Sequence, residues 1–417
     1  MSNVQEKLSW IHQEKHQKIL MLISELSGEG RFVGGAVRNS LLGLPFDDFD
    51  IATTLLPNEL MAGLSDKGVC VIPTGIEQGT VTAVIEKQPY EITTLRRDEE
   101  TDGRRAKVKF TNSWEADASR RDFTINAIYV DSNGKLYDYF NGLQDISLGK
   151  VRFIGNPTQR IKEDFLRILR FFRMHAFYAK TELNEECLSA CIELRHNLRI
   201  ISGERITKEI LRMLCSKNPW PCIRSMHKND FFKHIFTINE QAPSFNSQIF
   251  ENICQLEKTL RMQSDNLTRL CSIGGHHFPR LRLSRNQQKF LNLVYSCSAS
   301  ISHAKTSIAK NIYTCGKDIT IGSLWIQQAA NMHEKHEAGS SAERLKKAIE
   351  FVNTYEITEF PITGKDMLSL GLTGEKIKHS LAYARNWWID RWAESGTYPS
   401  AQDCINHLMD KINNIKL

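Results

Sequence analysis

The sequence predicts an α+β protein, with a mixed α/β region at its N-terminal end and an all-helical region behind it. Residues 30–150 mix alternating, strand-like segments with Gly and Pro turns. From about residue 151 onward the strand signals stop and helical periodicity takes over. The 417 residues suffice for several domains, and contents of 41% hydrophobic and 24% charged residues are ordinary for a globular protein.

The first 26 residues are expected to form an amphipathic helix that covers the first domain. They contain Glu, Gln and His and show no small-residue cleavage site, so they do not resemble a signal peptide. Their longest apolar run, residues 19–23, is too short to span a bilayer, and no membrane association is expected.

The net charge and the cysteines indicate which partners and which cellular compartment suit the protein. The net charge of +6 permits a polyanionic partner without requiring one. The ten cysteines are scattered, form no CxxC pair and show no four-ligand zinc pattern. Reduced thiols in the cytoplasm fit this pattern best.

The rest of the chain is organised around residues 31–54, which predict a strand, a glycine turn, a short helix and a second strand. Gly34 and Gly35 form the turn. Asp48 and Asp50 open the second strand, and they point the same way because strand side chains alternate. Two carboxylates beside a helix N-terminus suit Mg²⁺ that carries a nucleotide's phosphates. Taken alone, a surface strand with solvated acids explains these residues equally well.

The next segment predicts a β-hairpin followed by a loop. Residues 80–85 and 90–95 alternate as strands do, with a turn at Pro89 between them. Glu91 lies on the second of these strands. The charged residues 96–110 show no hydrophobic period and are expected to form a loop.

Residues 119–130 bring together several polar side chains next to an apolar run. Arg120 and Arg121 offer planar bidentate donors for phosphates or a ribose. Asp122 and Asn126 lie four apart and share a face if the chain is helical there. The alternative is the end of a strand or helix with solvated charges.

Residues 160–175 predict one amphipathic helix with a charged arc opposite its apolar side. Intrahelical ion pairs would explain that arc, but arginines outnumber acids on it. Asp164 and Arg167 together offer an acceptor and fork donors toward one ligand edge, as a complementary base would. The arc comprises Arg160, Glu163, Asp164, Arg167 and Arg170, with Arg173 at its margin.

These motifs together resemble the class II CCA-adding enzyme and bacterial poly(A) polymerase family. The resemblance covers residues 31 to about 212 in the family's order and spacing, and it rests on GGAVRN, DDFDIATT, PTGIEQGTVTAVI, YEITTLRRD, RRDFTINA, YDYFNGLQD and RIKEDFLRILR. Residues 280–284 and 361–377 resemble the family's body and tail more weakly.

The resemblance implies a domain order and a catalytic set. It predicts a nucleotidyltransferase head with a mixed sheet, then an all-α neck, body and RNA-binding tail, at residues 1–150, 151–215, 216–330 and 331–417. Asp48 and Asp50 would be the Mg²⁺ ligands, and Glu91 the third catalytic carboxylate.

The resemblance also implies a set of nucleotide-binding residues. Gly34, Gly35 and Arg38 would approach the phosphates, and Arg121 and Asp122 would handle the ribose and triphosphate. Asp164 and Arg167 would form the amino-acid template for CTP and then ATP. The further nucleotide contacts would be Arg170 and Arg173. Asn39 departs from the family's usual acid, which affects hydrogen bonding in this loop rather than metal binding.

The implied reaction is addition of CCA to tRNA 3′ ends from CTP and ATP. The alternatives are poly(A) polymerase, a CC-adding or A-adding enzyme, a small-molecule nucleotidyltransferase and a non-catalytic RNA-binding relative. The ending DKINNIKL lacks a basic extension, and the segment 96–110 is present; both favour full CCA addition. Seven Lys and Arg but one acid between Lys258 and Lys289 suit either RNA phosphates or a solvated face.

Overall fold

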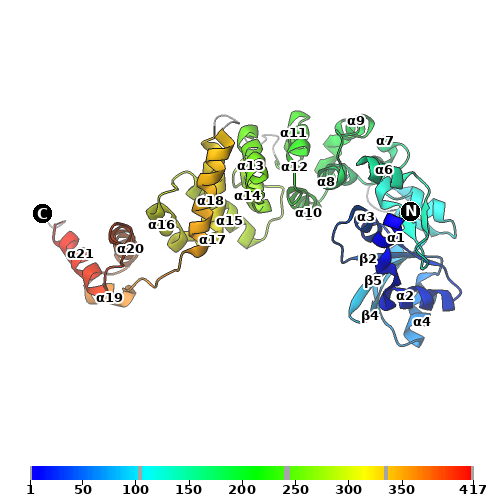
Figure 1. Ribbon diagram of the computed structural model, residues 1–417, viewed down its shortest axis with the longest axis horizontal. Helices are drawn as coiled ribbons and strands as arrows, with labels where there is room; N and C mark the ends of the chain where they lie inside the picture. Colours follow the sequence, from blue (N-terminus) through cyan, green and yellow to red (C-terminus); the bar gives the residue numbers. More distant parts are fainter. Residues whose placement is uncertain (1, 102–105, 239–244, 333–336, 415–417) are drawn as a thin grey trace. The chain divides into compact units, whose positions relative to one another are not determined.

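The computed structural model describes residues 2–101, 106–238, 245–332 and 337–414. They form two compact units, Met1–Ile235 and Phe236–Leu417. The α+β class is confirmed, because the strands all lie early in the described chain and helices make up the rest (Figure 1). The finer division into head, neck, body and tail stays a prediction. Within the described residues, no helix is long and apolar enough to cross a bilayer.

The first unit is built on a mixed seven-stranded sheet with the order β3-β4-β5-β2-β1-β8-β9. β2 and β5 run parallel, and the other neighbours run antiparallel. The predicted hairpin is confirmed as β4 and β5, in which Thr82 lies opposite Glu91. The strands are β1 (Gly30–Val33), β2 (Phe49–Thr53), β3 (Cys70–Gly75), β4 (Thr80–Ile85), β5 (Gln88–Thr94), β8 (Ile128–Val130) and β9 (Leu136–Asp138).

The loop predicted for residues 96–110 is wrong. β6 (Arg96–Thr101) and β7 (Ala106–Phe110) pair antiparallel as a separate two-stranded sheet. Residues 102–105 of this segment lie outside the described residues. The residues of β6 are all polar, so they carry no apolar period, but the residues of β7, AKVKF, alternate apolar and polar side chains as strands do.

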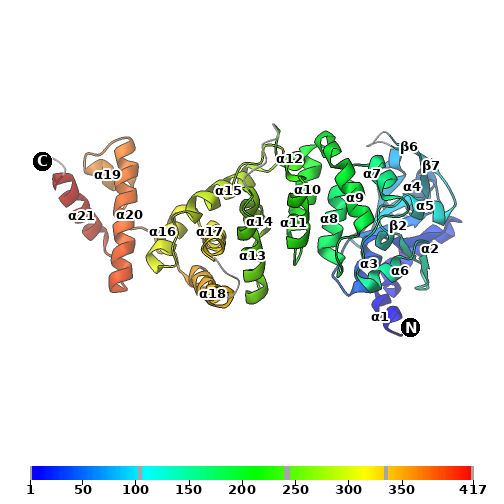
Figure 2. The same cartoon turned by 90° about the horizontal axis from the view of Figure 1, so that it is seen from above.

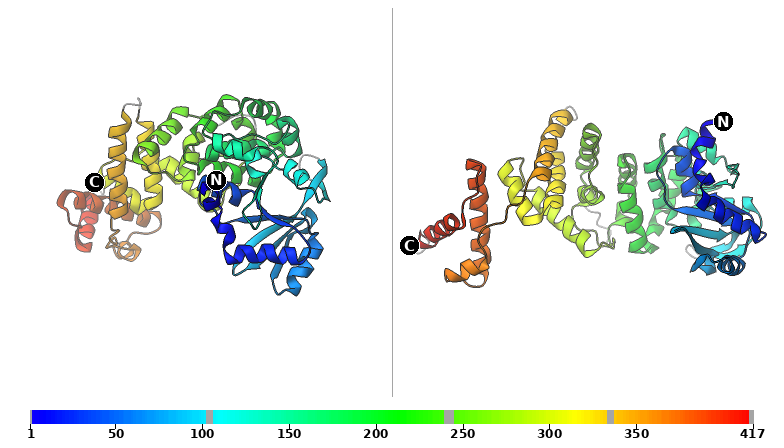
Figure 3. Two further views of the ribbon diagram at one scale, coloured as in Figure 1. Left: turned by 45° about the vertical axis from the view of Figure 1, so that its right-hand side comes forward. Right: turned by 60° about the horizontal axis from the view of Figure 1, so that its bottom comes forward.

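The single N-terminal helix predicted for the first 26 residues is also wrong, although the segment does cover the sheet. It divides into α1 (Ser2–Lys7), the 3₁₀ turn η1 (Ser9–His12) and α2 (Glu14–Glu25). Gln13 interrupts the helix because its ψ of 140° is extended. Ile19 and Ile23 of α2 are fully buried in the core of the sheet, and Figure 3 shows the blue N-terminal helices against the strands.

Strand alternation supplies two cores, one on each face of the sheet. Phe32 and Ile51 belong to the core that α2, α3 (Gly35–Leu42) and α4 (Pro57–Asp66) cover. Their chain neighbours Val33 and Ala52 belong to the opposite core. β1 and β2 are therefore buried on both faces, which fixes the ends of these strands as a rigid support.

Helices and short 3₁₀ turns complete the first unit. α8 packs against both α10 and α11, and α7 packs against α9. They are η2 (Ile76–Gln78), α5 (Trp114–Ser119), η3 (Thr124–Asn126), α6 (Gly142–Leu148), α7 (Pro157–Glu163), α8 (Arg167–Tyr178), α9 (Glu185–Leu194), η4 (Arg195–Ile200), α10 (Gly203–Leu214), α11 (Trp220–Lys228) and α12 (Phe232–Ile235).

The continuous helix predicted for residues 160–175 is wrong, since α7 ends at Glu163 and α8 begins at Arg167. Asp164 between them is extended, with φ −154° and ψ 107°. Its carboxylate accepts a hydrogen bond from the backbone N–H of Leu166 at 3.0 Å. An Asp side chain that bonds to nearby backbone in this way competes with helix continuation.

The second unit is helical throughout its described residues (Figure 2). α13, α17 and α18 pack on one another, and a buried ion pair joins Arg269 to Glu257 at 2.5 Å. The helices are α13 (Ser247–Leu260), α14 (Asn266–Gly274), α15 (Arg285–Ser298), α16 (Lys305–Cys315), α17 (Lys317–Ala330), α18 (Ala338–Thr354), α19 (Gly364–Ser369), α20 (Glu375–Ser395) and α21 (Ala401–Asn414).

Candidate active site

The site is built where β1 ends and β2 begins. Val33 is the register partner of Asp50, and Gly34 turns the chain into α3 with φ 77° and ψ −125°. A side chain is strained in that conformation. A Cβ on Gly34 would lie 3.4 Å from Oδ2 of Asp50 and 3.9 Å from Nη1 of Arg121. The glycine turn, a carboxylate and a guanidinium therefore converge within a few ångströms.

Three carboxylates gather around the start of β2. Asp50 lies beside Glu91 in the parallel register of β2 and β5, whereas Asp48, predicted to open this strand, directly precedes the observed β2. Burial, Glu91 and Asp48 raise the pKa of Asp50 to about 6, against the opposing effect of Arg121 and Arg38. Crowded carboxylates of this kind suit a divalent cation, which removes their mutual repulsion.

The carboxylates do not form a complete metal cage. In the parts of the chain that the structure describes, no three His, Cys, Asp or Glu side chains are close enough to hold a metal ion. Mg²⁺ in nucleotide sites takes one or two protein carboxylates and completes its shell with water and substrate phosphates. The residues around Asp50 fit that pattern of binding.

Arg38 of α3 is buried and held on several sides. Its guanidinium donates to the side-chain oxygen of Asn126, to the hydroxyl of Tyr178 at 2.7 Å and to Oδ1 of Asn39 at 2.9 Å. The ring of Tyr178 covers the guanidinium with 4.1 Å between carbon and ring centroid. Asn39, in place of the expected acid, also donates to the carbonyl of Pro45 at 2.9 Å.

Arg121 is held by a fully buried carboxylate that sequence reasoning did not single out. Asp117 of α5 accepts from Arg121 at 3.1 Å, from Arg120 at 2.5 Å and from the hydroxyl of Tyr129 at 2.8 Å. Burial alone would raise the pKa of Asp117, but the two arginines outweigh it and lower this pKa to about 2. Asp117 therefore stays charged and fixes both arginines.

Asp122 connects the sheet region to α8. It accepts from Arg170 at 2.5 Å and from the amide of Asn126 at 3.0 Å, so the predicted proximity of Asp122 and Asn126 is confirmed. Burial opposes ionisation, but Arg170 and Asn126 lower the pKa of Asp122 to about 2. Through Asn126 this chain of hydrogen bonds continues to Arg38.

Asp164 and Arg167 both face the site, but each has its own partner. Asp164 pairs with Arg205 of α10 at 2.7 Å. Arg167 pairs with Glu163 at 2.5 Å and donates to the backbone carbonyl of Arg120 at 3.2 Å. The two side chains do not pair with each other, so both keep orientations set by the surrounding protein.

The predicted nucleotide residues line one cavity of about 510 Å³. Eight arginines and three aspartates face it, so its wall is strongly cationic and suits a polyphosphate. Asp48 and Glu91 do not line this cavity and lie at its margin beside Asp50. The predicted residues that line it are Gly34, Gly35, Arg38, Asp50, Arg121, Asp122, Asp164, Arg167, Arg170 and Arg173.

Sequence reasoning missed the contribution of α10. Arg205 and Arg212 line the cavity, and Glu209 between them binds Arg173 at 2.6 Å. These three residues follow the spacing i, i+4, i+7, which places them on one face of a helix. This charged face, opposite an apolar face, was the sequence signal that could have identified α10 as part of the site. Tyr178 carried no comparable signal, since its role depends on the position of Arg38.

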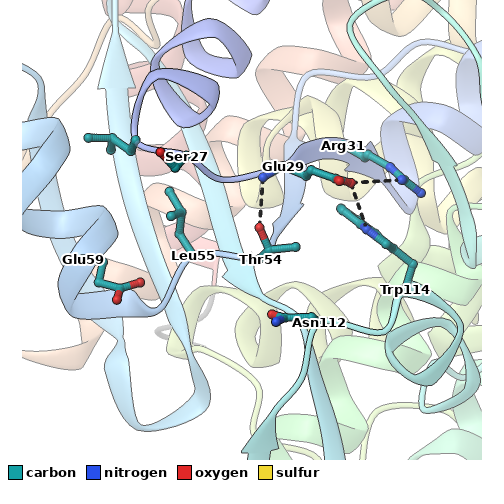
Figure 4. A pocket seen from close by; sticks show the side chains of 9 residues that line it. Ser27, Glu29, Arg31, Thr54, Leu55, Glu59, Asn112 and Trp114 are labelled. Atoms are coloured by element: carbon teal, nitrogen blue, oxygen red, sulfur yellow. Dashed lines mark hydrogen bonds and ion pairs between the residues drawn. The ribbon is translucent and has the colours of Figure 1, made fainter.

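A larger cavity, of about 810 Å³, lies at the opposite end of β1 and β2 (Figure 4). Glu29 there accepts from Arg31 and from the indole N–H of Trp114, both at 3.2 Å, and its own backbone N–H donates to Thr54. Its lining carries one arginine and two glutamates, so it lacks the cationic wall of the first cavity.

Comparison with known proteins identifies the family. Residues 30–152 match the model of the poly A polymerase head domain, and residues 182–245 match a probable RNA- and SrmB-binding site of polymerase A. The mitochondrial CCA tRNA nucleotidyltransferase 1 of Mus musculus is 31% identical over 403 residues, which cover 93% of this chain and 88% of the mouse protein. The chain belongs to the CCA tRNA nucleotidyltransferase family. The CCA-adding enzyme of Enterococcus faecalis is 30% identical over 84% of this chain and 85% of its own length.

Solved structures of this family share the fold. The Bacillus stearothermophilus CCA-adding enzyme in complex with CTP aligns with a TM-score of 0.71 and 23% identity, over 97% of this chain and 98% of that one. The Thermotoga maritima CCA-adding enzyme complexed with tRNA aligns with a TM-score of 0.68 and 20% identity, over 98% of both chains. The predicted fold class, a mixed sheet followed by helices, is thus that of the family.

Proposed function

We propose that this protein adds CCA to tRNA 3′ ends from CTP and ATP and releases pyrophosphate. The observation that carries this proposal is the single cavity in which the Gly34 turn and Asp50 meet the arginines of α8. Transfer of a nucleotide needs those two parts together: carboxylates for a cation at the reacting phosphate, and cationic groups for the triphosphate.

We assign metal binding to Asp48 and Asp50, with Mg²⁺ as the ion and Glu91 as the third carboxylate. Bound Mg²⁺ in such a site lowers the pKa of the terminal 3′-hydroxyl and offsets charge on the phosphates. Asp50 is half-buried at the end of a rigid strand, so it fixes where that charge compensation acts. The protein supplies position rather than a covalent nucleophile.

The arginines around the cavity have separate tasks in this proposal. Arg38 and Arg121 are fixed beside the Gly34 turn and bind the triphosphate, where their charge offsets the charge that develops on the leaving pyrophosphate. Asp122 keeps Arg170 and Asn126 in place through its hydrogen bonds. The ribose contact that the resemblance implies for Asp122 requires these hydrogen bonds to rearrange, because they occupy its carboxylate.

Base selection is assigned to Asp164 and Arg167. A carboxylate accepts from the exocyclic amine that cytosine and adenine share, and a guanidinium donates to a ring nitrogen or carbonyl. Arg205 pairs with Asp164 and Glu163 pairs with Arg167, so both side chains present a fixed pattern to the base. Arg170 and Arg173 complete the wall of the same cavity.

RNA binding is proposed for the helical second unit. A groove of about 650 Å³ beside α15 is lined by Arg282, Arg285 and Lys289 among others. Lys and Arg side chains of this kind bind phosphates without sequence preference. We also propose a cytoplasmic location, which the scattered, free cysteines of the chain favour.

The test is nucleotide-by-nucleotide extension of tRNA that lacks its last three nucleotides. We expect two additions with CTP alone, none with ATP alone, and CCA with both. Asp48→Ala combined with Asp50→Ala should abolish incorporation, while Asp66→Ala, on an exposed position of α4, should leave it unchanged. Long A-tails from ATP alone would indicate a poly(A) polymerase. Tight tRNA binding without turnover would indicate a non-catalytic relative.

A further inference from the structure

Two thiols of the second unit lie in direct contact. Sγ of Cys297 on α15 and Sγ of Cys315 on α16 are 3.3 Å apart, and both residues are half-buried. The bond between two disulfide sulfurs measures about 2.05 Å, so the thiols are within about 1.3 Å of bonding distance. This pair has no part in the proposed transfer chemistry, because the cavity around Asp50 lies wholly in the first unit.

We propose that Cys297 and Cys315 form a reversible intramolecular disulfide when the protein meets a hydroperoxide. Both cysteines lie near helix ends, since Cys297 is the penultimate residue of α15 and Cys315 is the last residue of α16. Gly316 follows with φ 89°, and a Cβ there would meet no atom within 4 Å. Helix ends yield more readily than helix interiors, so the sulfurs approach by side-chain rotation with a small shift of these ends.

The contact makes each sulfur a resolving thiol for the other. Burial, with the hydrogen bond to Cys297, raises the pKa of Cys315, and the contact permits either sulfur to be the donor. Whichever thiol is oxidised first, the other lies 3.3 Å away and resolves it.

The reaction runs in two balanced steps. The thiolate of one cysteine attacks one oxygen of hydrogen peroxide, the O–O bond breaks, and that cysteine becomes a sulfenic acid while hydroxide takes up the thiol proton as water. The sulfur of the other cysteine then attacks the sulfenic acid sulfur and displaces its hydroxyl, which leaves as water with the proton of the second thiol. Two thiols lose two electrons, and one peroxide becomes two waters.

Another thiol pair in the described chain offers a matched comparison. Cys187 and Cys191 lie one turn apart on α9, and both are almost completely buried. Burial raises the pKa of each of these thiols, so neither forms a thiolate readily. Replacing Cys187 with Ser removes one cysteine without affecting the contact between α15 and α16.

The experiment treats the full-length reduced protein with a small excess of hydrogen peroxide, removes the peroxide, and then unfolds the protein in guanidinium chloride with N-ethylmaleimide, which blocks the remaining thiols, buried ones included. We expect the number of blocked thiols to fall from ten to eight. A non-reducing tryptic digest should yield peptide 290–305 joined to peptide 311–317. Dithiothreitol should restore both thiols, and the oxidised protein should melt at a higher temperature because the bond closes a loop in the unfolded chain.

The variants separate this proposal from general oxidation. Cys297→Ser and Cys315→Ser should each abolish the joined peptide, whereas Cys187→Ser should retain it. The proposal is overturned if the native protein gives individually oxidised Cys297 and Cys315 without the joined peptide. It is equally overturned if the two peptides are joined only in covalent dimers. A native-like far-ultraviolet circular dichroism spectrum of each Ser variant checks that the variant is folded.

Discussion

Tyr178 is expected to position Arg38 for binding the triphosphate, and Tyr178→Phe tests this with one atom. The substitution keeps the ring over the guanidinium at 4.1 Å but removes the hydroxyl that accepts from Nη2 at 2.7 Å. A hydrogen bond to a charged group contributes about 1.5–3 kcal/mol. Since Nη2 also donates to Asn39, we expect a loss of about 1–2 kcal/mol, or roughly 5- to 30-fold in kcat/KM.

The pattern of this loss distinguishes a positioning role from general damage. The loss should appear mainly in KM for the nucleotide, and equally for CTP and ATP, because both carry the same phosphates. KM for tRNA should not change. Tyr178→Ala should lose more activity, since it also removes the contact between ring and cation.

Tyr137→Phe is the matched control for this experiment. The ring of Tyr137 lies 3.6 Å from the guanidinium carbon of Arg31, and its hydroxyl bonds to Asp131 at 3.0 Å, at the far end of the sheet. It should leave both KM values unchanged. An unchanged KM for CTP in Tyr178→Phe, or an equal rise in Tyr137→Phe, would refute the positioning role of Tyr178.

Four further outcomes are expected. Gly34→Ala places a side chain in a conformation that costs about 1–3 kcal/mol and 3.4 Å from the carboxylate of Asp50, which we propose binds the metal, so incorporation should fall at least tenfold while a melting curve shows a folded protein. Arg205→Gln should change the ratio of correct to incorrect nucleotide incorporated more than it changes pyrophosphate release, because it releases Asp164, the carboxylate proposed to select the base; an unchanged ratio would contradict this. Arg269→Ala leaves Glu257 charged and buried, so urea unfolding of the second unit should show a loss of about 3–5 kcal/mol, and a loss below 1 kcal/mol would count against the pair. Asp117 has a folded pKa of about 2 against an ordinary 3.8, so its contribution of about 2 kcal/mol is present above pH 3.8 and disappears as pH falls toward 2; native protein should therefore lose more stability than Asp117→Asn between pH 5 and 2.5.

The part of the site around Gly34 and Asp50 could be predicted from the sequence, because its residues are close in the chain. Gly34 and Asp50 come from one strand–turn–helix–strand segment, and the alternation of strands predicted their shared edge. The β4–β5 hairpin was predicted for the same reason, since its pairing is local. Local chain geometry and the period of apolar residues were sufficient to predict these elements.

Most of the parts that were missed depend on contacts distant in the chain. Arg205 reaches Asp164 across 41 residues, and Tyr178 reaches Arg38 across 140, so no spacing rule relates them. In the β6–β7 ribbon, β6 is entirely polar and carries no strand period, whereas β7, AKVKF, alternates and was overlooked within a charged segment. The break before α8 follows from one side-chain bond of Asp164, which a helical wheel does not represent.

The extended residue between α7 and α8 has a consequence for how substrate choice evolves in this protein. Asp164 lies outside both helices, so its carboxylate can change direction by side-chain rotation without breaking a hydrogen bond within α8. The arginines on α8 that we propose bind the phosphates keep their positions during such a change. In the proposed function, base selection and nucleotide transfer are therefore separately adjustable traits, divided at the three residues between α7 and α8.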